Sequence, residues 1–483
     1  MARPRAFRSC TLRRLAAATA AGALLLCAAP GASAVTYHGT QLSPYWSSEP
    51  PAEVDRQLDL ARDAGANVIR VNLSWSSLQE DGPREYSSWY VAKADRLFEH
   101  AHQRGLAVIP NLWSTPCWAT TAPSHLVDAC AGEWWGRGVT KYPPVDVDDY
   151  AAVAAFAARR WGRYMAGLQI WNEPNHTFWV SPDQAADYAR LVKAAYPAIK
   201  AADSRVPVVA GGLAGADGQF LERLYAQGIR GYFDAFSIHP YSNNRSPSAP
   251  ATGEARRWSM ASGVPWIRQV MLDHGDSRPL WLTEFGWTTC MDFTRKCVSP
   301  AAQAEHTAEA WWVIAGFSYV LGATQYQLRD NGTDPQALED NYGLVRRDGS
   351  VKPAYAAFRA GQGTSAAERP FDVEIRDVRL TRRLARGIEV RIRCSSLCRP
   401  SVGVRLRYGR LVARRTFRGQ GARGDVLLRV PPSSRMKRVI RSAPRGARLL
   451  VTLRAAGEGG QVRRTDFHRP LLRTYRRSSA WSR

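Results

Sequence analysis

The stretch Gln169-Ile170-Trp171-Asn172-Glu173-Pro174-Asn175 decides how most of this chain is expected to fold. It begins in a short apolar run, Gly167–Trp171, and changes at once to polar residues and proline, as a buried strand followed by a turn does. A second stretch, Trp281-Leu282-Thr283-Glu284-Phe285-Gly286-Trp287, has the same form. In both stretches a glutamate stands at the end of a predicted strand.

Apolar runs of this kind alternate with amphipathic segments from residue 35 to residue 362, which is typical of βα units and a parallel sheet. Eight strands are expected, over Thr36–Leu42, Ala66–Leu73, Ala107–Trp113, Gly167–Trp171, Val206–Gly211, Ala235–His239, Leu280–Phe285 and Ala323–Leu328. Eight units in about 330 residues predict an α/β fold of the (β/α)8 TIM barrel type. The alternative is a doubly wound open sheet, but the sequence has no Gly-rich phosphate loop to support it.

The helices between these strands are expected over Pro51–Ala64, Ser88–Arg104, Asp146–Trp161, Ser181–Ala202, Leu221–Gln227, Gly253–His274 and Pro300–Gly316. Five glycines stand where helix C-caps are expected: Gly65, Gly105, Gly162, Gly228 and Gly275.

The two glutamates indicate chemistry, because the carboxyl ends of barrel strands meet at one face and carry the active site. Glu173 and Glu284 end the fourth and seventh predicted strands. Cleavage of a glycosidic bond needs such a pair, since one carboxyl protonates the leaving oxygen and the other attacks the anomeric carbon or activates water. The alternative is that each glutamate only caps a strand or pairs with Arg70. Two glutamates at matching places, each beside aromatic residues, favour the catalytic interpretation.

Trp171-Asn172-Glu173-Pro174-Asn175 followed by Thr283-Glu284-Phe285-Gly286 resembles the clan A glycoside hydrolases, most closely family 39 and next family 5. The resemblance covers residues 35–362. It implies a retaining glycosidase acting on a β-linked substrate, with Glu173 as general acid/base and Glu284 as nucleophile. It also implies a carboxyl separation of roughly 5–5.5 Å and requires no metal or organic cofactor.

The resemblance implies roles for four neighbouring residues as well. Asn172 would hydrogen-bond the sugar 2-hydroxyl, Arg70 would hold the nucleophile ionised, and His239 and Tyr241 would contact the glutamates. The alternative for His239 is a hydrogen-bonded histidine of the core. One departure from the family pattern is Gln325-Tyr326-Gln327, where many relatives place a tryptophan as the floor of the sugar site.

Aromatic residues near the strand ends are candidates for sugar contacts, because sugar rings present flat apolar faces to aromatic platforms. The chain has 17 tryptophans. Trp75, Trp118 and Trp287 are expected to contact the substrate, together with Asn111 at the end of the third predicted strand. The alternative for the tryptophans is packing in the core.

The first 34 residues have the form of a signal peptide, with a cationic start, an apolar core over Leu15–Pro30 and Ala32-Ser33-Ala34 before the cleavage position. A retained anchor is the alternative, but the apolar run is short for a bilayer span. The protein is therefore expected to be secreted, extracellular or attached to the cell wall. Six further cysteines form close pairs that predict disulfides: Cys117/Cys130, Cys290/Cys297 and Cys394/Cys398. The last pair has a ligand-like spacing, but no second Cys or His cluster accompanies it to make a zinc site.

Charge divides the chain after a linker expected at 363–370. Residues 371–483 contain 30 Lys and Arg and 7 Asp and Glu, whereas residues 35–370 contain 31 and 35. Within the basic part, apolar residues alternate with arginine, which predicts a small β-sandwich-like domain over 371–470 and a disordered tail over 471–483. Strands are expected over Val373–Leu380, Ile388–Arg393, Val402–Tyr408, Val426–Val430 and Ala447–Leu453.

The basic domain is expected to contact an anionic cell-wall polymer. Nucleic acid is a poor fit, because no recognition helix or aromatic RNA motif is present. A solvated structural appendage is the alternative. For the whole chain, the competing functions are a non-catalytic carbohydrate- or wall-binding protein on a barrel scaffold, and a transglycosidase that uses the same two glutamates.

Overall fold

In the computed structural model the described residues are 35–43, 49–291, 296–361, 373–380, 388–408, 411–419, 422–442, 448–457 and 462–470. The expected signal peptide (1–34), linker (363–370) and basic tail (471–483) lie outside them. None of the helices among the described residues has both the length and the apolar character needed to cross a membrane.

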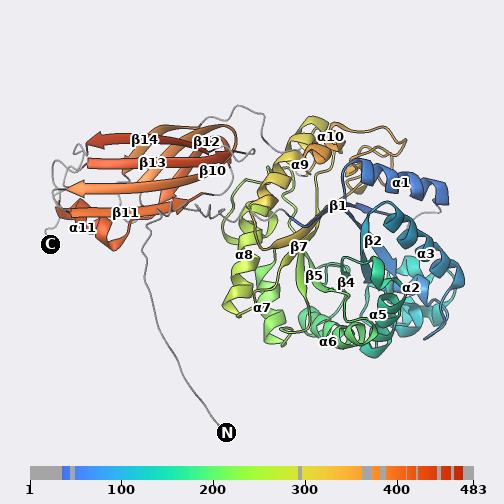
Figure 1. Cartoon of the computed structure of the whole chain (residues 1–483). Helices are drawn as coiled ribbons and strands as arrows, with labels where there is room; N and C mark the ends of the chain where they lie inside the picture. Colours follow the sequence, from blue (N-terminus) through green and yellow to red (C-terminus); the bar gives the residue numbers. More distant parts are fainter. Residues whose placement is uncertain are drawn as a thin grey trace, which may run out of the picture.

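Eight parallel strands form a closed barrel (Figure 1), which confirms the predicted α/β barrel. The strands are β1 (Tyr37–Leu42), β2 (Val68–Ser74), β3 (Ala107–Trp113), β4 (Leu168–Ile170), β5 (Val208–Ala214), β6 (Ala235–His239), β7 (Leu280–Phe285) and β8 (Val320–Gln325). The barrel closes because β1 pairs with β8, from Tyr37 opposite Gly322 to Thr40 opposite Gln325. The carboxyl ends of all eight strands therefore open at one end of the barrel.

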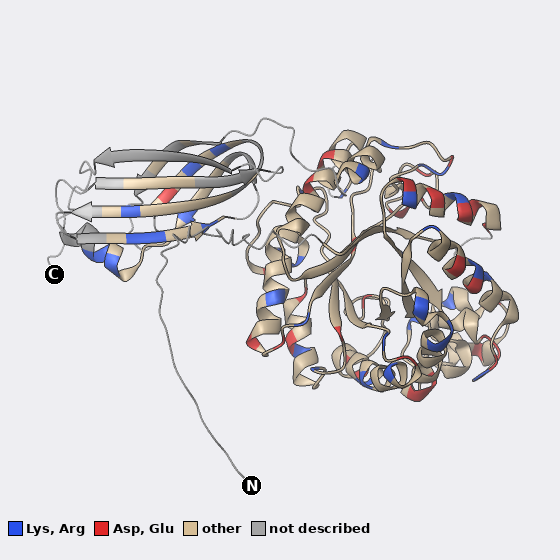
Figure 2. Cartoon of the chain, in the orientation of Figure 1, with Lys and Arg blue, Asp and Glu red and all other residues tan. Residues whose placement is uncertain are grey.

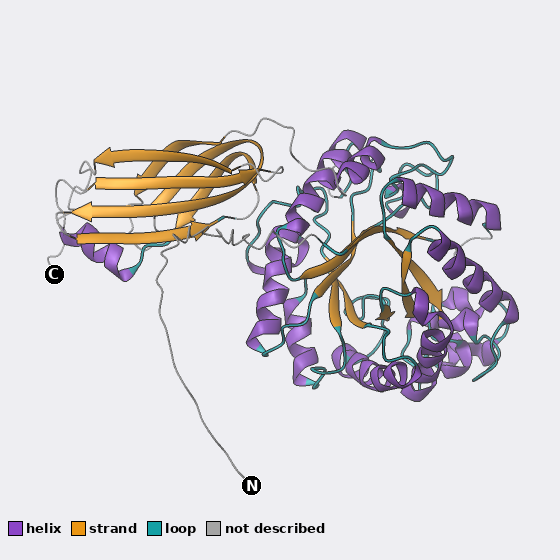
Figure 3. Cartoon of the chain, in the orientation of Figure 1, coloured by secondary structure: helices purple, strands orange, loops and turns teal. Residues whose placement is uncertain are grey.

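Helices surround the barrel (Figure 3), and all of them except α4 bury apolar residues against it. They are α1 (Pro51–Asp63), α2 (Trp75–Leu78), α3 (Ser88–Gln103), α4 (Ser124–Val127), α5 (Val147–Trp161), α6 (Gln184–Ala202), α7 (Gly218–Ala226), α8 (Met260–Asp273), α9 (Pro300–Ala315) and α10 (Pro353–Gly361). Polar side chains start several of them. Asp146 accepts a hydrogen bond from the Asp148 amide before α5, and Ser299 accepts one from the Ala302 amide before α9.

Two elements differ clearly from the sequence prediction. The eighth strand is Val320–Gln325 rather than Ala323–Leu328, because the chain after Gln325 turns into the wall of the cavity described below. The helix expected over Gly253–His274 is divided into a 3-10 helix, Gly253–Trp258, and α8, since Ser259 is extended and caps α8.

The glycines expected at helix C-caps are of two kinds. Gly65, Gly105, Gly228 and Gly275 have φ between 67° and 85°, the left-handed region that glycine adopts without strain. Gly162 was expected to do the same, but its φ is −53° and it begins a further 3-10 turn. Glycine is required there for space, because a Cβ would lie 2.6 Å from a methyl group of Val206.

The amino-terminal end of the barrel is filled by Trp281 of β7. Its ring stacks on Tyr37 of β1 at a centroid distance of 5.3 Å and contacts the backbone of β8 at Gly322. Small and branched residues of the other strands complete this cluster: Val68, Ile109, Ala166, Val209 and Ala235. Since this end is packed, ligand can enter only from the carboxyl ends of the strands.

The basic part of the chain forms an antiparallel sheet with one helix, and its β-rich character agrees with the prediction. Its elements are β9 (Val373–Leu380), β10 (Ile388–Tyr408), β11 (Leu411–Arg418), β12 (Ala422–Val430), α11 (Ser434–Ser442), β13 (Arg448–Gly457) and β14 (Val462–Pro470). The first part of β10 pairs with β9 and β12, and its second part pairs with β11 and β13. One hydrophobic cluster joins residues from both parts, including Val390, Val404 and Leu453.

Two details of this sheet correct the sequence prediction. The strands expected over Ile388–Arg393 and Val402–Tyr408 are one strand with a register shift between Cys394 and Cys398. Strands β11 and β14 and helix α11 were not predicted, because charged residues interrupt their apolar pattern. The disulfides confirm the expected pairing: Cys117–Cys130, Cys290–Cys297 and Cys394–Cys398.

The packing of Trp281 predicts that Gly322→Ala destabilises the barrel. The added Cβ would lie 2.4 Å from a ring carbon of Trp281, so the ring must move. We expect a loss of about 1–3 kcal/mol in the free energy of unfolding, measured by thermal or denaturant unfolding. The matched control is Gly136→Ala, because nothing lies within 4 Å of a Cβ at that exposed position. Equal stability of the two variants would contradict the packing described here.

Candidate active site

Arg70 of β2 is a fully buried arginine at the centre of the site. Its Nη1 donates to Glu284 Oε1 at 2.6 Å and to the side chain of Gln41, its Nη2 donates to Asn172 Oδ1 at 2.9 Å, and its Nε donates to Gln169 Oε1 at 3.1 Å. A buried guanidinium needs such partners for both its charge and its N–H groups. One side chain thereby ties β1, β4, β7 and the turn after β4 to β2.

Glu284 lies in β7 and is 8% exposed. Its Oε1 accepts from Arg70, and its Oε2 accepts from the Tyr241 hydroxyl at 2.8 Å and lies 3.6 Å from Nδ1 of His239. Burial acts to raise the pKa of Glu284, but His239, Arg70 and the hydrogen bond from Tyr241 outweigh it and lower this pKa below its ordinary value. By linkage, ionised Glu284 stabilises the fold above the unfolded-state pKa, and this stabilisation is lost as the pH decreases through the lowered folded-state pKa.

Glu173 follows β4 by three residues, on a turn with unusual backbone angles. Trp171 has φ of 65° and Glu173 has φ of 46°, a conformation that costs a non-glycine residue about 1–2 kcal/mol. Two contacts hold the turn. Trp171 is fully buried and donates from its indole to the Phe178 carbonyl at 2.9 Å, and the Glu173 amide donates to the Gly212 carbonyl at 2.9 Å. The turn aims the Glu173 carboxyl back toward the barrel axis.

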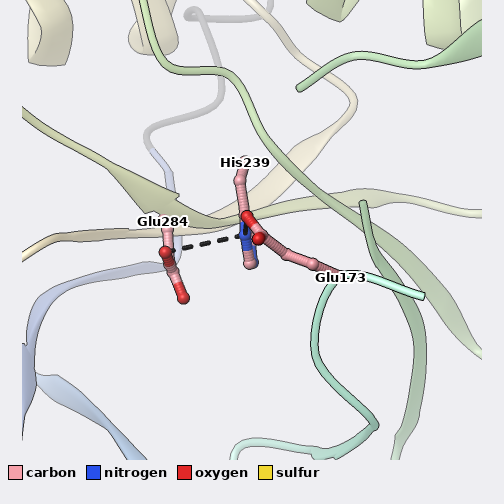
Figure 4. Close-up of side chains that lie close together, drawn as sticks. All are labelled: Glu173, His239 and Glu284. Atoms are coloured by element: carbon pink, nitrogen blue, oxygen red, sulfur yellow. Dashed lines mark hydrogen bonds and ion pairs between the residues drawn. The ribbon is translucent and has the colours of Figure 1, made fainter. Parts of the chain in front are cut away.

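His239, the last residue of β6, lies between the two glutamates (Figure 4). Its Nδ1 is 2.8 Å from Glu173 Oε1, and its ring is fully buried. One oxygen of Glu173 and one oxygen of Glu284 lie within 4.8 Å of each other. The two carboxyl groups therefore face a common space at the mouth of the barrel.

The orientation of the Asn172 amide follows from its partner. Arg70 carries only donors, so the atom of Asn172 at 2.9 Å from its Nη2 is the carbonyl oxygen. The amide nitrogen is then free of that contact, and Asn172 lines the cavity in front of Glu173. It can donate a hydrogen bond to a ligand hydroxyl.

Glu173, His239 and Glu284 are also the kind of residues that bind metal ions, and their ligand atoms lie close enough to share one. Their hydrogen bonds favour a different use. Both oxygens of Glu284 already accept hydrogen bonds, one of them from the cation of Arg70, and Glu173 Oε1 contacts His239. A divalent cation would have to displace these partners, so the donor set fits a pair of catalytic carboxyls better than a metal centre.

A cavity of about 640 Å³ opens in front of the two glutamates. One wall consists of Tyr241, Tyr326 and Tyr342, whose rings meet edge to face at centroid distances of 5.2–6.4 Å. Glu339 lies on the same wall and accepts a hydrogen bond from the Tyr326 hydroxyl at 3.2 Å. Burial, followed by the negative charges of Glu284 and Glu173, raises the pKa of Glu339, against the hydrogen bond from Tyr326. The cavity is of a size and polarity that suits a small polar ligand.

Six of the residues singled out from the sequence come together here. Glu173, Glu284, Asn172 and Tyr241 line the cavity, and Arg70 and His239 lie buried directly behind them. Asn111 is fully buried and donates to Asn72 Oδ1 at 3.0 Å, so it supports Asn72, which lines the cavity. The register of β2 and β3 places these two asparagines opposite each other.

The structure does not bring the three candidate tryptophans to the cavity. Trp75 begins α2, is fully buried and donates from its indole to Gln79 Oε1 at 2.7 Å. Trp118 packs edge to face on Trp75 at 6.0 Å, and its indole donates to the Gln79 carbonyl. Trp287 is 1% exposed and donates to the Arg245 carbonyl. With the indole N–H groups satisfied inside the protein, packing is the role that their positions support.

The cavity contains residues that the sequence did not single out: Asn72, Trp113, Phe178, Trp258, Glu339 and Tyr342. It also contains Tyr326, from the stretch that departs from the family pattern. A signal existed for Trp113, because it lies two residues after Asn111 in a strand and so belongs to the same side. Trp258 and Glu339 lie in 3-10 turns after β6 and β8 and had no signal in the sequence.

Comparisons with known proteins agree with this geometry. A family model described as cellulase (glycosyl hydrolase family 5) matches residues 28–318. A family 39 glycoside hydrolase from the gut symbiont Bacteroides cellulosilyticus WH2 has a similar structure, with a TM-score of 0.56 and 17% identity over 83% of this chain and 80% of that chain. A β-glucosidase mutant derived from a hyperthermophilic tetrameric structure has a TM-score of 0.50 and 16% identity over 68% of this chain and 95% of that chain. At such low sequence identity, these two structures show only that the fold is similar. A search of curated proteins found no match to the chain.

The contacts of Glu284 predict that Tyr241→Phe raises its pKa. The variant removes one hydrogen bond to the carboxylate and keeps the ring, so the ionised form loses a stabilising partner. NMR titration of 13C-labelled glutamate carboxyls measures the change, which should be an upward shift for one glutamate. Tyr355→Phe is the control, because that hydroxyl donates to the Leu60 carbonyl. A titration unchanged in Tyr241→Phe would show that the hydroxyl does not stabilise the carboxylate.

Proposed function

The chain belongs to glycosyl hydrolase family 5 and is a glycosidase, and from this premise we propose that it is a secreted retaining enzyme acting on a β-linked oligo- or polysaccharide. In this proposal Glu173 is the general acid/base and Glu284 is the nucleophile. The observation that carries it is the pair of glutamates at the mouth of the barrel, whose nearest oxygens lie within 4.8 Å of each other. Arg70 donates to Glu284, and among the described residues no arginine or lysine lies at hydrogen-bond distance from Glu173.

The distance between the carboxyls supports retention. Retaining glycosidases hold the two groups roughly 5–5.5 Å apart, whereas inverting enzymes need roughly 6.5–9.5 Å to place a water between the second carboxylate and the sugar. The nearest oxygens of Glu173 and Glu284 lie within 4.8 Å of each other, which agrees with the shorter of these two separations. A direct attack by the carboxylate is the reaction that this spacing favours.

The surroundings of the two carboxyls support their roles. Glu284 has a lowered pKa and two hydrogen-bond donors, so it is ionised and oriented for attack. In the first step its oxygen forms a bond to the anomeric carbon while the bond from that carbon to the leaving oxygen breaks. Glu173 gives its proton to the leaving oxygen. The products are a glycosyl ester on Glu284, a free alcohol and an ionised Glu173.

The second step reverses the proton transfer. The Glu173 carboxylate takes a proton from a water molecule, whose oxygen forms a bond to the anomeric carbon as the ester bond to Glu284 breaks. The sugar leaves with the configuration it had, and both glutamates return to their first protonation states. His239, at 2.8 Å from Glu173, is placed to orient the carboxyl in both steps, and Asn172 to donate to the sugar 2-hydroxyl.

Two features support secretion and the class of substrate. The signal-like first 34 residues and the three disulfides fit an oxidising compartment outside the cytoplasm. In the cavity, the rings of Trp113, Tyr326 and Tyr342 offer apolar faces beside polar side chains, the combination that binds sugar rings in water. Tyr326 lies just after β8, where many clan A relatives are expected to have tryptophan.

The proposal is tested first by the release of sugars from a panel of plant, fungal and bacterial polysaccharides and aryl β-glycosides. Glu284→Ala is the control, because it removes the nucleophile and nothing else from the cavity wall. Release by the wild type and not by the variant supports the glycosidase and identifies its substrate. Binding of sugars without release by either protein would favour a carbohydrate-binding protein, and longer oligosaccharides as the main products would favour a transglycosidase.

Glu284→Ala should lose nearly all turnover and regain part of it with azide. The small anion can occupy the space of the missing carboxylate and attack from the same side, so the product is a glycosyl azide of inverted configuration. Mass spectrometry and NMR of the product measure this. If Glu173→Ala and not Glu284→Ala formed the glycosyl azide of inverted configuration, Glu173 would be the nucleophile and Glu284 the acid/base.

Glu173→Ala should lose more activity on substrates whose leaving oxygen must be protonated than on substrates with a good leaving group. For a poorly activated leaving group the loss should be roughly 10²–10⁴-fold in kcat/KM, the usual contribution of general acid catalysis. For an aryl glycoside with an acidic phenol the first step should be nearly unaffected. The comparison of the two substrates is internal to the variant, and equal losses on both would rule out the acid role.

A further inference from the structure

The charged residues of the C-terminal sheet are arranged in two different ways along β10. In its first part, Ile388–Cys394, each charged residue pairs across the ladder with a residue of opposite charge: Glu389 with Arg379 and Arg429, Arg391 with Asp377, and Arg393 with Asp425 and Glu374. The pair of Arg429 and Glu389 has an Nε–Oε1 distance of 3.1 Å. In these pairs four arginines stand opposite four acidic residues, and we call these paired positions the neutral part of the sheet.

The second part of β10 differs. Val402, Val404 and Leu406 are buried in the core, and the positions that alternate with them continue across β11, β13 and β14 in register. In the register that the structure describes, these alternating positions hold eight arginines and one acidic residue, Asp466. The arginines are Arg399, Arg405, Arg407, Arg414, Arg418, Arg448, Arg454 and Arg464. We call this set of positions the arginine face.

Several arginines of this face stand directly opposite one another. Arg405 is paired with Arg414, Arg407 with Arg448, and Arg454 with Arg464. Like charges directly opposite on neighbouring strands, about 4.8 Å apart, destabilise a sheet. Arg414 and Arg418 are exposed and Arg405 is half-buried. Such a pairing, as of Arg405 with Arg414, disfavours the sheet, and a bound polyanion would remove the repulsion.

A general preference for arginine does not explain the pattern. The barrel part of the same chain, residues 35–370, contains slightly more acidic than basic residues. Within the C-terminal sheet, the neutral part and the arginine face share strand β10, and both contain basic residues. Figure 2 shows basic residues on several strands of this sheet. What distinguishes the two parts is the position of the acidic residues, which are gathered in one of them.

We propose that the arginine face binds a linear anionic polysaccharide through the carboxylates of its uronic acid units. The choice of a polysaccharide rests on the proposed function, since an appended surface would hold the enzyme on a polymer of sugars. The carboxylate is the anion that a sugar carries in its own carbon skeleton, and the guanidinium fork matches it with two parallel hydrogen bonds. The arginine positions follow one another along and across the strands, as binding of an extended chain requires.

Single-stranded nucleic acid fits this face less well. Proteins that bind it combine a basic surface with aromatic rings on which bases stack. None of the positions of the arginine face holds Phe, Tyr or Trp. Phe417 of β11 and Phe467 of β14 occupy register positions opposite buried Val402 and Val451. Binding is expected from charge and shape without base stacking.

The test uses the full-length protein and immobilised polygalacturonate, with dextran as the neutral polymer. The variant Arg405→Ser/Arg414→Ser/Arg418→Ser removes three charges from the arginine face. The matched control, Arg391→Ser/Arg393→Ser/Arg429→Ser, removes three charges from the neutral part of the same sheet. We expect the first variant to bind at least about tenfold more weakly than wild type and the control to change by less than about threefold, with wild-type binding weakening from 50 to 500 mM salt.

Three readouts decide the proposal. Thermal unfolding must show both variants folded, and cleavage of a small aryl glycoside should be unchanged in both, because no substituted residue lines the cavity. Equal losses of polygalacturonate binding in the two variants would overturn it, and so would tighter binding of single-stranded DNA at the same charge concentration. Failure of the glycosidase with intact binding by the arginine face would refute the proposed function alone.

Discussion

The site depends on one buried cation. Arg70 has no contact with solvent, and a guanidinium in that position is stable only if its charge and its N–H groups are all satisfied. Gln41, Gln169, Asn172 and Glu284 supply the partners from three other strands and a turn. Arg70 and its four partners depend on each other. The arginine fixes where these four side chains lie, and the closed barrel is what brings them to it.

In the proposed mechanism, the same cation distinguishes the two glutamates, which are chemically identical side chains, and so gives them different roles. Arg70 and Tyr241 both donate to Glu284, and with His239 they lower its pKa in spite of its burial. Glu173 has His239 as its close partner and is aimed into the cavity by a turn in left-handed backbone. Environments that differ in this way are how proteins assign acid and nucleophile to two carboxyls a few ångströms apart. The strained turn after β4 therefore contributes to the site by orienting the Glu173 carboxyl.

Much of the barrel could be predicted because its signals are local. A short apolar strand, a polar strand end and an amphipathic helix are each visible within a few residues, and the position of Glu173 and Glu284 at the ends of β4 and β7 follows from them. The failure at Trp75, Trp118 and Trp287 has a physical cause. A strand end shows how far along the barrel a residue lies but not the direction in which the chain turns next, and Trp75 turns into α2 and packs on Trp118.

The same limit applies to the residues that were missed. Trp258 and Glu339 reach the cavity from long connections, whose course depends on packing between elements far apart in the sequence. In the C-terminal sheet, alternation predicted buried and outward positions, but only the register reveals that arginine stands opposite arginine. Charge composition therefore indicated an anionic partner for the basic region as a whole. The strand register limits the proposed binding surface to the positions of the arginine face.

The central claim is that Glu284 attacks the anomeric carbon directly, since the two carboxyls have the short separation typical of retaining enzymes. The most direct measurement is the configuration of the first sugar released by the wild-type enzyme, followed by 1H NMR during hydrolysis of an aryl β-glycoside that it cleaves. The account predicts that the β-anomer appears first and then mutarotates. An α-anomer appearing first would mean inversion and would contradict both the spacing argument and the role of Glu284.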